Sequence, residues 1–142
     1  MFKKVVSCIL ILSLLSLSVV YASESSQREP DNSGAKWSYT VSTSTLMSIS
    51  STGKATCVGS ITGYQNLATS IDIFLYLERY INGTWTTYPG GSWYQYFPSH
   101  KGTLSATIYV TKGYNYRLRA SYYANSGSNW ENIPGLSPTV YY

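Results

Sequence analysis

Apolar and polar residues alternate along most of the chain beyond residue 36, and a period of two is typical of β-strands. The longest alternating stretch is 71–88. One face of its first half is aliphatic: Ile71, Ile73, Leu75 and Leu77. An Asn-Gly pair in the middle of the stretch predicts a tight hairpin turn, because both central turn residues need a positive φ. We therefore expect two antiparallel strands here, with the aliphatic face in the core.

Similar alternation predicts the remaining strands, at about 37–49, 55–62, 93–97, 104–110, 114–122 and 130–142. Pro89-Gly90-Gly91 is expected to end the hairpin and separate it from the next strand. Small residues such as Cys57 and Gly59 at alternate positions indicate that an opposing sheet comes close. Seven to eight strands without helical periodicity predict an immunoglobulin-like or fibronectin-type-III-like antiparallel β-sandwich, with a closed antiparallel barrel as the alternative.

The first 36 residues differ from the rest in composition. A short basic head precedes an apolar run that ends in Val-Tyr-Ala, so residues 1–22 are expected to be a secretory signal peptide. Residues 23–36 are polar and contain Pro and Gly, which predicts a flexible leader, and residues 37–142 form the folded domain. The protein is thus expected to be secreted, with no membrane span after signal cleavage.

Charge and cysteine content exclude some classes of protein. Loss of Lys3 and Lys4 with the signal peptide lowers the formal charge from +4 to +2, too little and too scattered for a nucleic-acid surface. Cleavage also removes Cys8 and leaves Cys57, which rules out an internal disulfide. We expect Cys57 to be a small buried hydrophobe, with intermolecular pairing as the alternative.

Groups that could support catalysis are sparse. His100 is the single histidine and falls in a Pro-Ser-His-Lys-Gly turn, and no cluster of ligands indicates a metal or another cofactor. Asp72 and Glu78 lie six residues apart on one strand, about 20 Å, which is too far for a glycosidase pair. We expect these acids to pair across strands with arginines: Arg79, Arg117 or Arg119. The chain is therefore predicted not to be an enzyme, with no catalytic residue, cofactor or metal.

Aromatic residues give the one indication of function. The chain has 4 Trp, 15 Tyr and 3 Phe, and an alternating strand can bury only about half of its side chains. The candidate ligand contacts are Tyr76, Trp85, Tyr88, Trp93 and Tyr96. They indicate a secreted binding module, with a glycan or cell-wall polysaccharide as ligand. Cross-strand stabilisation of the sheet explains the same residues equally well.

Two other functions stay open at this stage. One is an extracellular protein-interaction or adhesion domain that uses the same face or the loop at residues 125–129, by analogy with other sandwiches. The other, less favoured, is a secreted antimicrobial or toxin, which the weak charge and the lack of an amphipathic helix argue against.

Two resemblances to known families follow from particular motifs. Residues 110–120 (VTKGYNYRLRA) resemble the E–F corner of fibronectin type III domains, although Lys112 stands where that family has Pro. That resemblance implies that the Tyr116 hydroxyl returns to the backbone a few residues upstream. Over about 37–142, the runs SSTGKATCVGSITGY, IDIFLYLERYINGTW and VTKGYNYRLRASYYA resemble a family of small secreted Firmicutes proteins of unknown function. It implies an exported all-β domain and no site residue.

Overall fold

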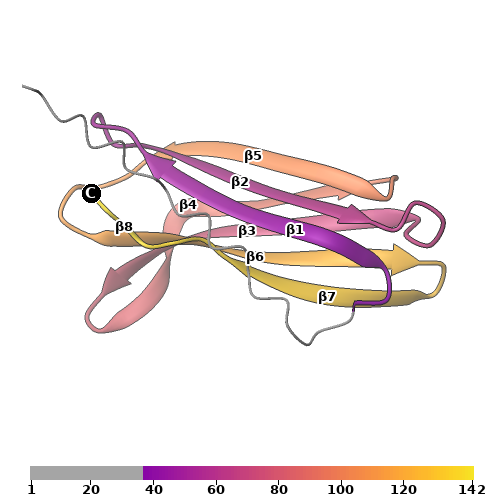
Figure 1. Ribbon diagram of the computed structural model, residues 1–142. Helices are drawn as coiled ribbons and strands as arrows, with labels where there is room; N and C mark the ends of the chain where they lie inside the picture. The colour runs from indigo at the N-terminus through magenta and orange to yellow at the C-terminus, as the bar shows by residue number, and fades with distance from the viewer. Residues whose placement is uncertain (1–36) are drawn as a thin grey trace, which may run out of the picture. The chain divides into compact units, whose positions relative to one another are not determined.

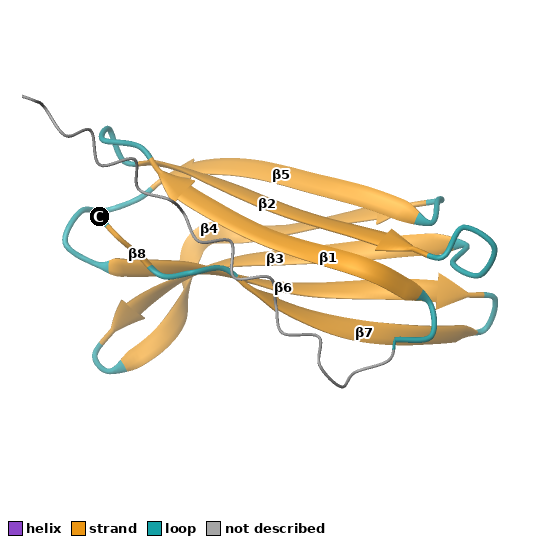
Figure 2. Ribbon diagram, viewed as in Figure 1, coloured by secondary structure: helices purple, strands orange, loops and turns teal. Residues whose placement is uncertain are grey.

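The computed structural model describes residues 37–142, so the expected signal peptide and leader lie outside the described residues. This part of the chain is all β-structure (Figure 2). Its strands are β1 (Thr40–Ile49), β2 (Lys54–Gly63), β3 (Ser70–Ile81), β4 (Thr84–Phe97), β5 (Lys101–Tyr109), β6 (Asn115–Ser126), β7 (Asn129–Leu136) and β8 (Val140–Tyr141). A search of residues 37–142 for a helix long and apolar enough to cross a membrane finds none.

The strands form two antiparallel sheets that pack face to face (Figure 1). One sheet has the order β1-β2-β5, and the other has the order β4-β3-β6-β7, with β8 paired to β6. No hydrogen-bonded ladder joins the two sheets across residues 37–142. The predicted antiparallel β-sandwich is therefore confirmed, with eight strands, and the alternative of a closed barrel is wrong.

The core lies between the sheets and uses the inward rows that the alternation predicted. β3 contributes Ile71, Ile73, Leu75 and Leu77, each with 0% of its surface exposed. The neighbouring row on β6 is also buried: Tyr116, Leu118, Ala120, Tyr122 and Ala124. The prediction for the aliphatic face of β3 is confirmed.

Tyr122 spans the space between the two sheets. Its hydroxyl donates to the carbonyl oxygen of Ser44 at 2.6 Å and lies 2.7 Å from Thr45 Oγ1, both on β1. Burial raises the pKa of Tyr122 to about 12, so the hydroxyl keeps its proton at neutral pH. A Cβ on Gly59 would lie 2.9 Å from this hydroxyl and 2.6 Å from Leu75 Cδ2. The small residue on β2 thus admits the tyrosine, as its place in the sequence suggested.

Tyr116 occupies the corner that leads into β6. Its hydroxyl donates to the carbonyl oxygen of Thr111 at 2.6 Å, five residues upstream. Its buried ring meets the ring of Tyr88 edge to face at 5.9 Å. The hydrogen bond expected from the fibronectin-type-III resemblance is therefore present.

β4 differs from the prediction. Pro89-Gly90-Gly91 does not separate two strands but lies inside one strand, Thr84–Phe97, as an irregularity in its pairing with β3. Gly90 has a φ of 75°, which a glycine adopts without strain. Because Pro cannot donate to a ladder, this position suits a bulge on an edge strand, and β4 is the edge of its sheet.

The bulge reverses the alternation of β4. Tyr76 pairs with Ser92, whereas Glu78 pairs with Thr87, so Leu77 faces four residues where a regular ladder has one. The three extra residues are an odd number. Side chains before and after the bulge therefore have opposite parity, a shift that sequence alternation alone does not reveal.

β1 begins at Thr40, later than the expected start at Trp37. The backbone amides of Ser38 and Tyr39 instead donate to the two carboxylate oxygens of Glu131 on β7, each at 2.8 Å. The amides are thus satisfied by a side chain rather than by a neighbouring strand, and the ladder with β2 starts afterwards.

Cys57 is fully buried in the inward row of β2, as expected, and its thiol is free. Burial raises the pKa of the Cys57 thiol from 9.0 to about 11. Between pH 9.0 and about pH 11, the folded protein therefore keeps this proton while the unfolded chain loses it. Folding stability falls as the pH rises through that range.

We expect iodoacetamide near pH 9 to alkylate Cys57 at least about 50-fold more slowly in the folded protein than in urea, because the thiolate is the reactive form. The mass of the peptide that contains Cys57, followed over time, measures both rates. Similar rates in the two states would contradict a buried, protonated thiol.

Candidate functional site

The outward side of the five-stranded sheet carries a continuous set of aromatic residues, which we call the aromatic face. Residues opposite each other in an antiparallel ladder project to the same side of the sheet. The ladders pair Phe74 with Tyr94, and Asp72 with both Tyr96 and Tyr123. The aromatic face consists of Phe74, Tyr76 and Tyr80 from β3, Trp85, Tyr94 and Tyr96 from β4, Tyr123 from β6 and Trp130 from β7.

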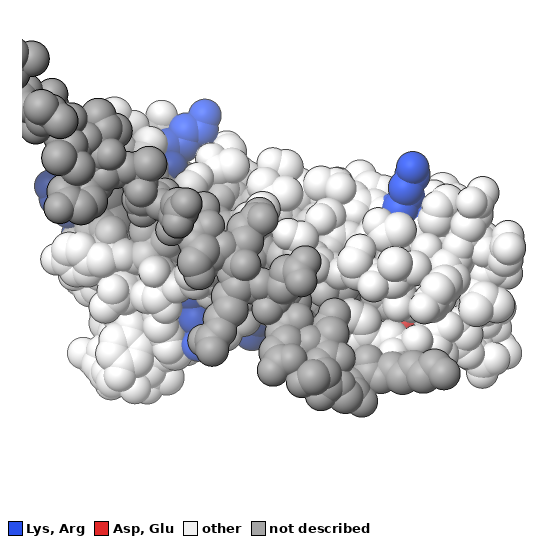
Figure 3. Space-filling model, in the orientation of Figure 1, with Lys and Arg blue, Asp and Glu red and all other residues white. Residues whose placement is uncertain are grey.

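The outward side of the other sheet has a different chemistry. Its paired positions are mostly small hydroxyl residues: Ser44, Ser48, Thr56, Ser60, Thr103 and Thr107. Figure 3 shows the molecule from the side of β1, and few of its visible described atoms belong to charged residues. The aromatic face is therefore the more distinctive surface of the domain.

One half of the aromatic face is organised around Glu78, and we call it the Glu78 cluster. The carboxylate accepts a hydrogen bond from Arg117 Nε at Oε2 and from Arg119 Nε at Oε1, each at 2.7 Å. Each guanidinium also covers a ring at 4.2 Å, Arg117 over Trp85 and Arg119 over Tyr76. Both cations thus sit between a carboxylate and an aromatic ring, a favourable place for a positive charge.

The arginines also control the ionisation of Glu78. Burial by itself raises the pKa of this carboxyl, but hydrogen bonds and charges from Arg119 and Arg117 outweigh burial and hold it below its ordinary value. Glu78 is therefore ionised at neutral pH. The expected cross-strand pairing of this acid with Arg117 or Arg119 is confirmed.

The other half of the aromatic face contains a shallow open depression of about 330 Å³, which we call the Asp72 cleft. Its lining residues are Asp72, Phe74, Tyr123, Asn125 and Trp130. The rings are mutually supported: the ring of Phe74 lies 4.6 Å from that of Tyr94 and 5.8 Å from that of Tyr123, which lies 5.6 Å from that of Trp130.

Exposure is high for such large side chains in and beside the cleft. Trp130 has 62% of its surface exposed, Tyr94 56% and Tyr96 52%. Contiguous exposed rings of this kind are uncommon on soluble domains and mark contact surfaces. The half of the aromatic face around Asp72 therefore offers apolar area to a ligand.

Asp72 provides the polar component of the cleft. Its Oδ1 accepts a hydrogen bond from the Tyr94 hydroxyl at 2.7 Å, and its Oδ2 accepts one from Asn125 Nδ2 at 3.0 Å. The hydrogen bond to Asp72 raises the pKa of Tyr94, which keeps the phenol a donor. The expected pairing of Asp72 with an arginine is wrong. Its partners in residues 37–142 are neutral, and both salt bridges there belong to Glu78.

The five candidate contacts do not share one side of the sheet. Tyr96 is exposed next to the Asp72 cleft, and Tyr76 and Trp85 lie on the aromatic face beneath arginines. Tyr88 and Trp93 instead pack against the core. Trp85 and Trp93 thus face opposite sides of the sheet, because the bulge in β4 reverses the side-chain alternation between them.

Tyr123, Asn125 and Trp130 line the cleft but are absent from the candidate contacts. Tyr123 follows the inward Tyr122, so the alternation of β6 predicts that Tyr123 faces outward. Trp130 lies opposite Asn125 across the β6–β7 hairpin, which closes at Gly127 with a φ of 62°. The polar residues around Gly127 indicate a turn at this point of the sequence, but no local pattern indicates that it lies close to Asp72.

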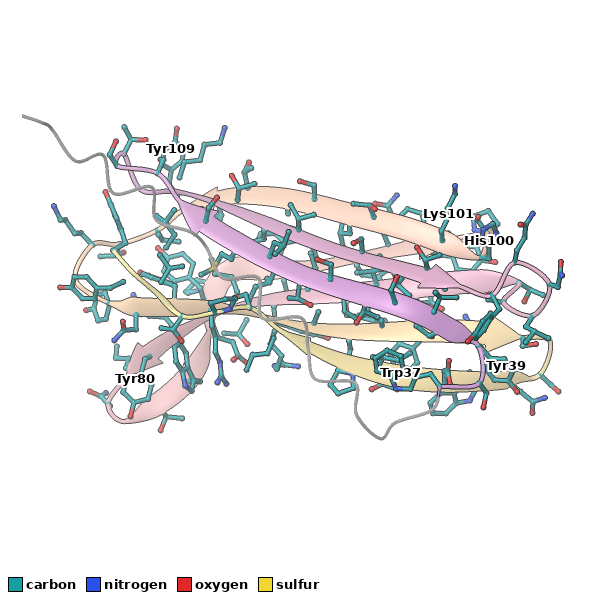
Figure 4. All side chains as sticks on the ribbon, viewed as in Figure 1. Trp37, Tyr39, Tyr80, His100, Lys101 and Tyr109 are labelled. Carbon is teal, nitrogen blue, oxygen red and sulfur yellow. The ribbon has the colours of Figure 1, made fainter. Side chains whose placement is uncertain are left out.

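Other potentially chemical groups lie apart from the aromatic face. His100 is half-buried in the turn between β4 and β5, where its carbonyl oxygen accepts a hydrogen bond from the amide of Gly63 at 2.7 Å. Figure 4 shows His100 at the opposite end of the domain from Tyr80. Within the described range 37–142, no three His, Cys, Asp or Glu side chains group as metal ligands would.

Comparison of the chain with protein-family models, with curated proteins and with solved structures finds no match. Of the Firmicutes family resemblance, only the all-β fold of two sheets is shown. The site must therefore be interpreted from its own geometry.

Proposed function

We propose that the protein is a secreted, non-catalytic module that binds a glycan in the Asp72 cleft of its aromatic face. The supporting observation is a group of exposed rings beside a carboxylate and an amide: Trp130 lines the cleft, and Tyr94 and Tyr96 lie next to it on β4. Secretion rests on the signal-peptide pattern of residues 1–22.

The chemistry of the cleft suits a sugar. A sugar ring has an apolar face that can lie on an aromatic ring, and hydroxyl groups at its edge that need hydrogen-bonding partners. Trp130 lines the cleft with an exposed ring and Tyr96 adds another beside it, and Asp72 and Asn125 supply acceptor oxygens. Binding sites commonly combine apolar walls with a few placed polar groups in this way. A shallow, open cleft fits an extended chain better than a small enclosed molecule.

The fibronectin-type-III-like class belongs to the same proposal. It is supported by the Tyr116 corner and by the division of the strands into sheets of three and five. In such sandwiches one sheet face is free for contact while the other covers the core.

We expect replacement of Trp130 by alanine to weaken glycan binding by at least about tenfold, because the ring supplies the most exposed apolar area of the cleft. The purified protein is incubated with insoluble glycans such as cellulose, chitin and peptidoglycan, and the bound fraction is measured after pelleting over a range of glycan concentrations.

Tyr109→Ala is the matched control, since Tyr109 is 67% exposed and lies on the other sheet. It should bind as the unchanged protein does. Failure of the folded protein to bind any glycan would remove the proposal, and equal losses in the two variants would remove the site.

A further inference from the structure

The two halves of the aromatic face have the same kinds of groups with one difference. In the Glu78 cluster, a carboxylate and two aromatic rings hold two cations, the guanidinium groups of Arg117 and Arg119. In the Asp72 cleft, a carboxylate lies among aromatic rings and its partners in the described chain are a phenol and an amide. The carboxylate and the rings are present there, while the cation is not supplied by residues 37–142.

The charge of Asp72 is therefore not compensated by a neighbouring side chain. The Tyr94 hydroxyl and Asn125 amide fix the carboxylate in position but leave its net charge at −1 when ionised. The nearest arginine along the aromatic face, Arg119, pairs in the ladder with Tyr76, four residues from Asp72, and is engaged by Glu78. One carboxylate shared by two guanidinium groups leaves the Glu78 cluster with a net charge of +1, but neither arginine forms a salt bridge with Asp72.

The aromatic rings that line the Asp72 cleft also favour a positively charged group there. The face of an aromatic ring attracts a cation within about 6 Å of its centroid, and the attraction grows when the site is partly desolvated. Phe74, Tyr123 and Trp130 line the same depression as the carboxylate. A group that fits here carries a positive charge and enough apolar surface to lie against the rings.

We propose that the Asp72 cleft binds an amino sugar with a free ammonium group in preference to its neutral, acetylated counterpart. This inference rests on the proposed function and specifies its ligand class. The ammonium group lies near Asp72 and the rings that surround it, and the sugar ring lies on Trp130. Acetylation removes the positive charge and leaves Asp72 without a cationic partner.

The test compares two oligosaccharides of equal length, a glucosamine hexamer and an N-acetylglucosamine hexamer, titrated calorimetrically into the purified protein at a pH where the free amines are protonated. We expect the glucosamine hexamer to bind at least about tenfold more tightly, and added salt to weaken it selectively. Asp72→Asn should remove most of that preference, because asparagine has nearly the same shape without the charge. Tyr109→Ala should preserve it.

Each outcome separates the inference from the proposed function. Equal affinity for the two hexamers, or a preference unchanged in Asp72→Asn, overturns the inference while the proposed function stands. No binding of any glycan overturns both. A hexalysine peptide that binds more tightly than the glucosamine hexamer overturns the sugar as ligand. If Asp72→Asn lowers the melting temperature, Trp130→Leu provides the second variant, and it must weaken binding of the glucosamine hexamer.

Discussion

Replacement of Gly59 by valine is expected to destabilise the domain by about 3 kcal/mol or more, the largest effect of a single substitution that we predict. A Cβ at this position would already lie 2.6 Å from Leu75 Cδ2 and 2.9 Å from the Tyr122 hydroxyl. Valine adds two methyl groups beyond that atom. Either the sheets must separate or Tyr122 must leave its hydrogen bonds to Ser44 and Thr45.

Urea unfolding followed by tryptophan fluorescence measures the loss. Ser60→Val is the matched control, because Ser60 is the next residue of β2 and faces outward, where a β-branched side chain is favourable in a strand. We expect it to change stability by less than about 0.5 kcal/mol. A loss in Gly59→Val no larger than in Ser60→Val would show that the sheets are not in close contact at this point.

The sequence was sufficient for features that depend on local alternation. The aliphatic row of β3 and the small residues of β2 both follow from the period of two, because a buried face must be apolar and a close contact must be small. The hydrogen bond of Tyr116 follows from a local motif whose partner is five residues away. The sandwich follows from the number and spacing of such strands.

The sequence was insufficient wherever the pairing between strands decides the outcome. Pro89-Gly90-Gly91 signals an irregularity, but only the ladder with β3 shows that three extra residues are accommodated. An even number would have kept Trp93 on the same side as Trp85, and an odd number moves it to the core. The inward position of Trp93 follows from that parity, whereas Tyr88 lies three residues from Trp85 and faces the opposite side by alternation alone.

The Asp72 cleft depends on strand order in the same way. Tyr123 and Asn125 lie on β6, which neighbours β3 although more than 30 residues separate the two strands in sequence. Trp130 reaches the cleft because β7 pairs with β6. Alternation assigns each of these side chains to an outward row, but the rows become a site only when the order of strands is known.

Replacement of Glu78 by glutamine is expected to destabilise the domain by about 2–3 kcal/mol, the second largest effect that we predict. The carboxylate accepts a hydrogen bond from each of two arginines on β6, and its side chain is only 8% exposed. Glutamine has nearly the same shape, so no cavity forms. The amide NH2 of the glutamine is a donor and would face the guanidinium of one arginine, which is also a donor. Arg117 and Arg119 would both lose the negative charge that they share.

Arg119→Met is the comparison variant. The side chain of Arg119 is 42% exposed, so its pairing with Glu78 is partly screened by water, and Arg117 would still satisfy the carboxylate. We expect a loss of about 1 kcal/mol or less, again from urea unfolding. A loss in Glu78→Gln that does not exceed the loss in Arg119→Met would contradict the central role of the carboxylate.

The pH dependence distinguishes lost charge from altered packing. Because the arginines hold the pKa of Glu78 below its ordinary value of 4.5, the folded state binds this proton less readily than the unfolded chain. The stabilisation is therefore complete above about pH 4.5 and is lost as the pH falls through the lower folded value. We expect the stability difference between the unchanged protein and Glu78→Gln to narrow on acidification. A difference that stays constant across this range would assign the loss to packing instead of charge.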